Sequence, residues 1–204
     1  ETDVQVTADG ILVAFHDDDL SRTCGRPGRI SDLPWSEVKT ALVDGTAPIP
    51  LLEDMLGTWP ELRVNIDCKT NTAEDALVTT LVRCAALDRV CVGAFSDRRM
   101  KRLTARLGDR LCTALSPGGV VALRFGRPRR PAANAAQVPV QQGPITVVNE
   151  RFVRRAHALG IKVHVWTIDE PAEMHRLLDL GVDGIMTDKP QVLRGVFEKR
   201  GAWR

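Results

Sequence analysis

The chain has 204 residues, with 28 basic and 26 acidic side chains and a formal net charge of +2. That length suffices for one sizeable hydrophobic core, and 44% hydrophobic with 26% charged residues is ordinary for a globular protein. The near-neutral charge predicts no nucleic-acid partner. No transmembrane segment is expected either, because no apolar run approaches the ~20 residues that a membrane helix needs.

The cysteines are odd in number and include no Cys-x-x-Cys pair; they are Cys24, Cys68, Cys84, Cys91 and Cys112. Most lie in apolar runs, so we expect reduced, partly buried thiols rather than a zinc site. Such thiols favour a cytoplasmic location. Secretion stays open, because the chain begins without Met and its original start is not in the sequence.

The first expected elements are two strands joined by a turn. An extended segment over residues 1–7 would place Glu1 and Asp3 on one face. An Asp-Gly pair at 9–10 is a strong hairpin signal, and the apolar run after it ends at His16. Two carboxylates and an imidazole within reach of one another suit a hard divalent cation and a proton-transfer group.

Taken alone, a Glu-x-Asp on a strand is more often a solvated face, and a lone histidine is more often structural than catalytic. The whole pattern is more specific: it runs Glu1-Thr-Asp-Val, then Thr7-Ala-Asp-Gly, then His16-Asp-x-x-Leu-x-Arg-Thr. In this pattern the chain resembles the glycerophosphodiester phosphodiesterase family, which hydrolyses deacylated phospholipids.

The resemblance also implies segments that this chain lacks. In the family, a strand carrying a His-Arg pair, a Pro-Glu-Asn-Thr-like loop and a helix precede the matching stretch, and the His supplies a second acid-base group. We therefore expect residues 1–204 to form a single TIM-barrel domain that is incomplete at its N-terminus.

A loop follows the first motif, and Ser31 or Asp32 would cap a short helix over 34–38. Another helix is expected to open at Pro48. The run 63–69 then alternates as a strand, with Asp67 and Lys69 on one face. Charges there need partners unless this is an edge strand with one wet face.

At this strand the family reads Glu-x-Lys, where the acid is a metal ligand and the Lys contacts phosphate. Asp67 is one methylene shorter than that Glu, which weakens it as a direct ligand without removing it. Lys69 fits a phosphate contact as a point charge.

The rest of the chain alternates between strands and helices with short connections, which predicts parallel strands and right-handed crossovers. Strands are expected near 1–7, 64–69, 90–95, 111–115, 136–140, 162–168 and 183–188, and further helices at 72–87, 98–107, 120–125, 149–159, 169–181 and 192–199. The resemblance implies an α/β fold, the eight-stranded (β/α)8 TIM barrel, with the first β/α unit missing. The basic, Pro-rich loop at 126–131 would steer an anionic substrate or be merely solvated.

In TIM barrels the site lies at the C-terminal ends of the strands. The resemblance implies that Glu1, Asp3 and Asp67 bind a divalent metal there, Ca²⁺ or Mg²⁺. His16 would serve as acid or base, and Lys69 would be both a catalytic group and a substrate contact.

Trp166 ends the strand at 162–168 and would form a substrate-binding wall beside the glycerol. Asp188, in the Gly-Ile-Met-Thr-Asp-Lys-Pro signature, has a mainly structural role in the family. The other histidines, His157, His164 and His175, are expected to be structural or surface residues.

The expected reaction converts a small glycerophosphodiester to glycerol 3-phosphate and an alcohol whose identity the sequence does not select. Two alternatives stay open. One is a truncated, non-catalytic barrel that binds a metal or an anion, or forms an oligomer through an open sheet edge. The other is a related barrel enzyme of the phospholipase D or C type.

Overall fold

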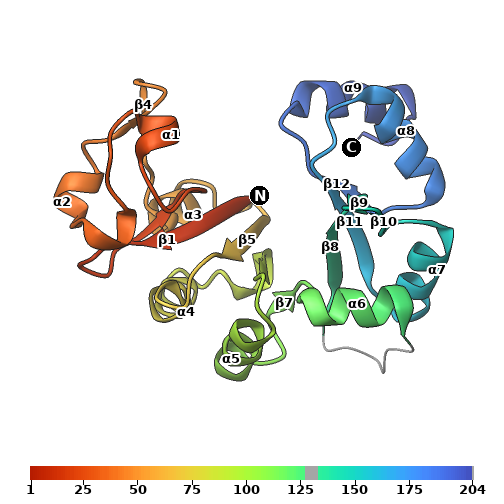
Figure 1. Cartoon of the computed structure of the whole chain (residues 1–204), viewed down its shortest axis with the longest axis horizontal. Helices are drawn as coiled ribbons and strands as arrows, with labels where there is room; N and C mark the ends of the chain where they lie inside the picture. Colours follow the sequence, from red (N-terminus) through yellow and green to blue (C-terminus); the bar gives the residue numbers. More distant parts are fainter. Residues whose placement is uncertain (127–132, 204) are drawn as a thin grey trace. The chain divides into compact units, whose positions relative to one another are not determined.

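The computed structural model describes residues 1–126 and 133–203, and Figure 1 shows its elements. Strands and helices alternate along the chain, as the sequence predicts. The chain divides into two compact units, Glu1–Cys112 and Thr113–Arg204. Beyond Gly126, the basic loop predicted at 126–131 lies outside the described residues.

The first unit is built on a five-stranded sheet with the order β2-β1-β5-β6-β7. β1 pairs in parallel with β5, and β5 with β6, whereas β2 returns antiparallel to β1. The bounds are β1 Thr2–Val6, β2 Leu12–Ala14, β5 Val64–Cys68, β6 Val90–Gly93 and β7 Cys112–Thr113. Gly10 has a φ of 83° in the turn between β1 and β2, which confirms the predicted hairpin.

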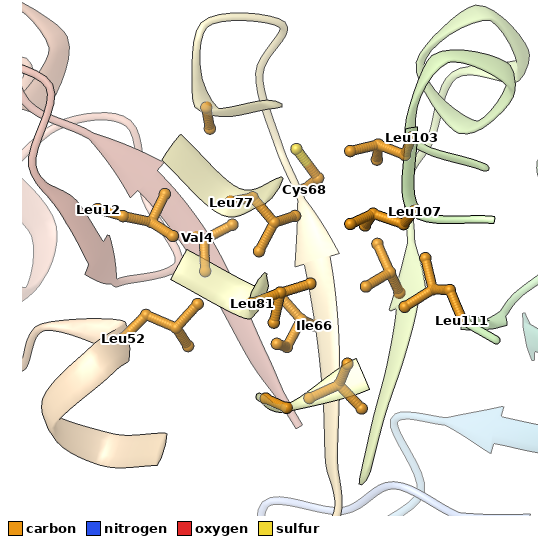
Figure 2. Packing of buried hydrophobic residues seen from close by; sticks show 14 of the residues in the cluster. Val4, Leu12, Leu52, Ile66, Cys68, Leu77, Leu81, Leu103, Leu107 and Leu111 are labelled. Carbon is orange, nitrogen blue, oxygen red and sulfur yellow. The ribbon is translucent and has the colours of Figure 1, made fainter. Parts of the chain in front are cut away.

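Two long helices cover one face of this sheet, α4 Ala73–Arg83 and α5 Asp97–Leu107. Val4 of β1 and Ile66 of β5 pack with Leu77, Leu81 and Leu103 in one fully buried cluster (Figure 2). This face takes the apolar members of each alternating strand. Asp3, Asp67 and Lys69 are therefore left on the opposite face, as expected from the period of two.

Shorter elements fill the connections of the first unit. They are α1 Ser21–Cys24, η1 Ile30–Asp32, α2 Trp35–Val38, β3 Leu42–Val43, β4 Ala47–Pro48, α3 Leu52–Thr58 and η2 Leu87–Arg89. Two predictions are wrong in detail. Neither Ser31 nor Asp32 caps α2; instead Asp9 Oδ1 accepts a hydrogen bond of 2.9 Å from the Trp35 amide. The next helix begins at Leu52 and not at Pro48, because that proline belongs to the β3–β4 hairpin.

The second unit has a parallel sheet with the order β12-β11-β8. Its elements are α6 Pro117–Phe125, β8 Ala135–Pro139, β9 Gln141–Gln142, β10 Ile145–Thr146, α7 Glu150–Ala158, β11 Lys162–Trp166, α8 Pro171–Leu180, β12 Gly184–Ile185 and α9 Pro190–Lys199. Val163 and Val165 of β11 pack with Phe152 and Met174 in the core. Within the described residues, no helix combines the length and apolar character needed to cross a bilayer. All five cysteines are free thiols.

Candidate active site

The site begins where β1 and β5 lie side by side. Asp3 and Asp67 occupy the same register position of these two parallel strands. Side chains at matched positions of a parallel pair project to the same face of the sheet. The two carboxylates therefore lie next to each other on that face. Lys69 lies just past the end of β5 and reaches back to both, with Nζ 2.9 Å from Asp3 Oδ1 and 3.6 Å from Asp67 Oδ2. The structure thus brings three predicted site residues into contact.

Burial and the neighbouring charges shift the pKa values of three residues in this cluster, Lys69, Asp67 and Glu1. Burial alone would lower the pKa of Lys69, but the hydrogen bond to Asp3 and the charges of Asp3 and Asp67 outweigh it and raise that pKa. Burial is also the main cause that raises the pKa of Asp67, and the neighbouring Asp3 adds to it. Glu1 has a raised pKa for the same two reasons. Lys69 is the ammonium in contact with Asp3 and Asp67, while the N-terminal amine acts on Glu1 and Arg99 acts on Asp67 from further away.

One oxygen of Asp67 is left without any hydrogen-bond partner. Oδ1 is fully buried and unsatisfied, the only such side-chain atom in residues 1–126 and 133–203. An unpaired buried carboxylate oxygen costs about 1–3 kcal/mol or more, so it marks a place where a ligand is favoured. Carboxylate oxygens are the donors that Ca²⁺ and Mg²⁺ prefer. The type of donor at this position, though not yet the arrangement of the three carboxylates, therefore suits a divalent cation.

The three carboxylates do not form a ready-made cage. In the parts of the chain that the structure describes, no group of three or more His, Cys, Asp or Glu side chains is placed to hold a metal. The positive charge in contact with Asp3 and Asp67 is instead the ammonium of Lys69. A metal site formed by Glu1, Asp3 and Asp67 accordingly stays a prediction.

His16 is tied to the same strand through the hairpin. The Phe15 amide donates to the Asp3 carbonyl at 2.9 Å, and Gln5 Nε2 donates to the His16 carbonyl at 3.3 Å. These bonds anchor the backbone of His16 to β1, the strand that carries Asp3. The imidazole itself is 66% exposed and open to a substrate.

Two residues without a predicted role, Asp17 and Arg22, form a network at the His16 ring. His16 Nδ1 lies 2.6 Å from Asp17 Oδ1, and Arg22 donates to both oxygens of Asp17, at 2.6 Å from Nε and 2.8 Å from Nη2. The hydrogen bonds from Arg22, and then from His16, lower the pKa of Asp17 to about 2. Both residues belong to the His-Asp-x-x-Leu-x-Arg-Thr motif, so the motif already contained the acidic and basic side chains of this network.

The motif folds so that Arg22 can reach back. Leu20 is fully buried and anchors the segment. Asp19 Oδ1 accepts a hydrogen bond of 2.7 Å from the Ser21 amide, which starts the single turn of α1. That turn brings Arg22 back over Asp17.

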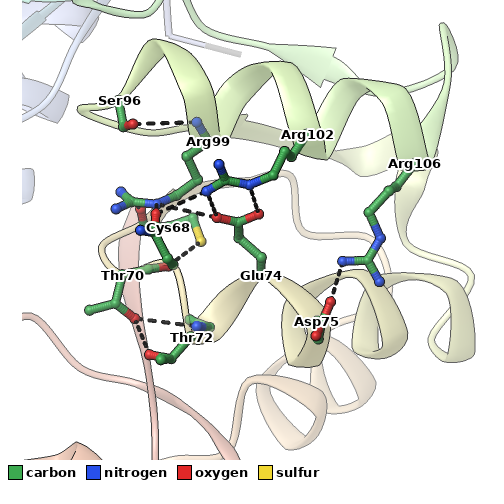
Figure 3. Close-up of polar contacts among 11 residues, drawn as sticks. Cys68, Thr70, Thr72, Glu74, Asp75, Ser96, Arg99, Arg102 and Arg106 are labelled. Carbon is green, nitrogen blue, oxygen red and sulfur yellow. Dashed lines mark hydrogen bonds and ion pairs between the residues drawn. The ribbon is translucent and has the colours of Figure 1, made fainter.

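A second polar network holds the exit of β5 (Figure 3). Arg99, on the first turn of α5, donates from Nη1 to the Cys68 carbonyl at 2.8 Å and from Nε to Asn71 Oδ1 at 3.2 Å. Arg102 donates from Nε to the buried Glu74 at 2.8 Å and also bonds Asn71. Cys68 lies between Asp67 and Lys69 in the chain, so this network fixes the backbone from which both side chains project.

The remaining predicted residues lie in the second unit. Trp166 is half-buried at the end of β11, and its contact with substrate stays a prediction. His157 Nε2 lies 2.7 Å from Asp183, and His175 contacts Arg200. His164 is packed so closely on Gly184 that a Cβ there would lie 2.9 Å from its ring. These contacts agree with structural roles for the three histidines.

Comparison with known proteins identifies relatives along nearly the whole chain. The model of the glycerophosphoryl diester phosphodiesterase family matches residues 1–192, a range that contains every predicted site residue. The probable glycerophosphodiester phosphodiesterase 2 of Mycobacterium tuberculosis is 40% identical over 212 residues, which cover 100% of this chain and 80% of that protein.

Solved structures agree with this assignment at the level of the fold. A putative glycerophosphoryl diester phosphodiesterase from Silicibacter pomeroyi matches with a TM-score of 0.81 at 20% identity, over 100% of this chain and 84% of its own. An Oleispira antarctica phosphodiesterase, in complex with the product sn-glycerol-3-phosphate, matches with a TM-score of 0.77 at 19% identity, over 97% and 83%. The predicted α/β TIM-barrel fold class is confirmed. The family inferred from the motifs is confirmed as well: the chain belongs to the glycerophosphoryl diester phosphodiesterase family of hydrolytic enzymes.

Proposed function

We propose that the protein hydrolyses glycerophosphodiesters to glycerol 3-phosphate and an alcohol, by acid-base catalysis that depends on Ca²⁺ or Mg²⁺. The buried, unpartnered Oδ1 of Asp67 beside Asp3 is the observation that carries the metal part of this proposal. The solved relative that holds sn-glycerol-3-phosphate as its product supports the reaction.

Glu1, Asp3 and Asp67 would hold the cation through carboxylate oxygens. Once bound, a divalent cation neutralises phosphate charge and polarises the phosphorus centre. Burial, and then the charge of Asp3, raises the pKa values of Glu1 and Asp67, so a bound cation would relieve the cost of ionising both groups.

Lys69 would bind a non-bridging phosphate oxygen of the substrate. Its pKa is raised, so the amine is a cation over the whole physiological range. The Nζ contacts with Asp3 and Asp67 leave its side chain 26% exposed, and an ammonium has three N–H donors. It can therefore donate to phosphate while it stays bound to Asp3.

His16 would move the proton. Hydrolysis adds water across one P–O bond: the attacking oxygen loses a proton and the departing alkoxide gains one. The exposure of the imidazole, and the backbone bond that holds its neighbour Phe15 to Asp3, support such a transfer. Trp166 would contribute a wall for the glycerol, an assignment that rests on the family resemblance.

The test is release of glycerol 3-phosphate from glycerophosphocholine by the purified protein. His16→Ala should lower kcat by about 10²–10⁴-fold. The matched control is His175→Ala, which removes a histidine that contacts Arg200 and should leave kcat unchanged.

The non-catalytic alternative makes a different prediction. A protein of that kind would bind Ca²⁺ in calorimetry but release no glycerol 3-phosphate from any phosphodiester. Equal activity of the His16→Ala variant and the wild type would instead contradict the acid-base role of His16.

A further inference from the structure

The side chains of His16, Asp17 and Arg22 form a hydrogen-bonded chain after the β1–β2 hairpin. Asp17 uses one oxygen, Oδ1, for the His16 ring and receives two N–H groups of Arg22 across both oxygens. The exposed fractions differ sharply: 66% for the His16 side chain, 67% for Arg22 and only 16% for Asp17 between them. The carboxylate is thus covered by its two partners.

The chemistry of an imidazole gives this contact a consequence. A neutral imidazole carries its proton on only one of its two nitrogens. The group that is hydrogen-bonded to one nitrogen decides whether that nitrogen carries the proton. An ionised carboxylate only accepts, so Asp17 requires the proton on Nδ1. Nε2 is then the basic atom, and it has no hydrogen-bond partner among the residues that the structure describes.

Arg22 makes this arrangement persistent. Its paired contacts hold Asp17 in the bidentate geometry that guanidinium and carboxylate share. The pKa of Asp17, about 2, keeps that carboxylate ionised at any pH at which the protein would work. A protonated Asp17 would have to donate and could no longer impose the tautomer.

We infer that Asp17, held by Arg22, is a positioning residue that fixes His16 as the Nδ1–H tautomer and makes Nε2 the atom that exchanges the proton. The inference rests on the proposed function, because it deepens the acid-base role given to His16. The substrate-facing nitrogen follows from contacts within the motif alone.

The same loop supplies a matched control. Asp18, the next residue, pairs with Arg29 at 2.6 Å, and both side chains are 61% exposed. This is also a carboxylate–guanidinium pair of the same loop, with a single and more exposed contact, and Asp18 makes no side-chain bond to His16 among the described contacts. An effect that came from losing any loop ion pair would therefore appear in Asp18→Asn as well.

The experiment reads the tautomer directly from long-range ¹H–¹⁵N spectra of the imidazoles at about pH 8.5, where ordinary histidines are neutral. His16 is assigned by the loss of its signals in His16→Ala. In the wild type we expect His16 protonated on Nδ1. Asp17→Asn, and Asp17→Ala as a second variant, should move the proton to Nε2, whereas Asp18→Asn should not.

Kinetics supply the second readout. Asp17→Asn should lower kcat, by up to the roughly 10⁴-fold found when the carboxylate that orients a catalytic histidine is replaced by its amide, with KM nearly unchanged. Asp18→Asn should leave both constants as in the wild type. Circular dichroism of each variant checks that it is folded.

Two results would overturn the inference: His16 keeps the Nδ1 proton in both Asp17 variants, or Asp18→Asn lowers kcat as much as Asp17→Asn. Failure of the proposed function gives a different pattern. If the wild-type protein hydrolyses no phosphodiester, but the His16 tautomer changes in the Asp17 variants alone, the positioning role of Asp17 stands and the proposed reaction is wrong.

Discussion

Asp3 and Asp67 stand at matched positions of two neighbouring parallel strands, and the amine of Lys69 joins them. The pairing of β1 with β5 thereby brings together carboxylates from two separate motifs. One lysine does not balance them, and the buried Oδ1 of Asp67 is left over. The predictions below follow from this imbalance and from the networks around it.

Removing the lysine should separate its two roles. Lys69→Met leaves Asp3 and Asp67 without their shared cation, so we expect the free energy of unfolding to fall by about 1–3 kcal/mol. We also expect kcat/KM to fall by about 10²–10³-fold, because a donor to the phosphate is lost. Urea unfolding and steady-state kinetics measure the two effects.

Lys162→Met is the control for that variant, since Lys162 pairs with Asp183 at 2.9 Å but is 67% exposed. It should change neither quantity appreciably. An active Lys69→Met variant with wild-type KM would contradict the phosphate contact.

Asp67 should contribute to stability against unfolding when Ca²⁺ is bound but not when the protein is metal-free. At neutral pH the ionised Asp67 is destabilised by burial and by Asp3, as its raised pKa shows, so Asp67→Asn should unfold at the same temperature as the metal-free wild type or higher. The wild type at a Ca²⁺ concentration of 100 Kd should gain about 2.7 kcal/mol. The variant should lose most of that gain.

Thermal unfolding with and without Ca²⁺ makes this comparison. Asp54→Asn, which alters an exposed carboxylate on α3, should retain the full Ca²⁺ effect. An Asp67→Asn variant that Ca²⁺ stabilises as strongly as the wild type would exclude Asp67 as a ligand.

The network at the β5 exit should be a stability element. Glu74 is 5% exposed and is the counter-charge of Arg102 and Arg99. Glu74→Gln should therefore cost about 1–3 kcal/mol of the free energy of unfolding. The adjacent Asp75, whose side chain is 90% exposed and pairs with Arg106, offers the control: Asp75→Asn should cost less than about 0.5 kcal/mol.

Equal losses in those two variants would mean that the buried network contributes no more than a surface ion pair. Urea unfolding at neutral pH distinguishes the two outcomes.

Acid should remove the contribution of Asp17 in a defined window. The pKa of Asp17 is about 2 in the folded protein, below its ordinary value of 3.8. The stability that this carboxylate contributes is therefore present above about pH 4 and is lost as the pH falls through 2. The difference in unfolding free energy between wild type and Asp17→Asn, below about 1 kcal/mol at neutral pH, should vanish across this window.

Urea titrations at a series of pH values from about 5 to 1.5 follow that difference. A difference that stays constant across the series would mean that Asp17 is not stabilised as an anion by Arg22 and His16.

Local patterns predicted much of the fold and the core of the site. The period of two in β1 and β5 gave the faces of Asp3, Asp67 and Lys69, because burial of one sheet face decides the orientation of every side chain along a strand. The positions of the longer strands and helices followed from the same periodicities, whereas the short hairpins β3–β4 and β9–β10 were not predicted. Both predicted features depend on neighbouring residues alone.

Contacts across the chain were beyond local patterns. The cap of α2 comes from Asp9, 26 residues before Trp35, and no local rule selects it over Ser31 or Asp32. Pro48 was assigned to a helix because prolines open helices, yet it pairs in the β3–β4 hairpin. Asp17 and Arg22 are both present in the motif, but their contact could not be predicted from it, because it depends on the turn of α1 that brings the two side chains together.

The most direct test is the rate of glycerol 3-phosphate release from glycerophosphocholine by metal-stripped protein as Ca²⁺ or Mg²⁺ is added back. The account predicts negligible release in chelator and a saturable recovery with the cation that Asp67→Asn weakens. Release at the full rate in chelator, unchanged by either cation, would contradict the claim that the Asp3–Asp67–Lys69 cluster is the centre of a metal-dependent phosphodiesterase.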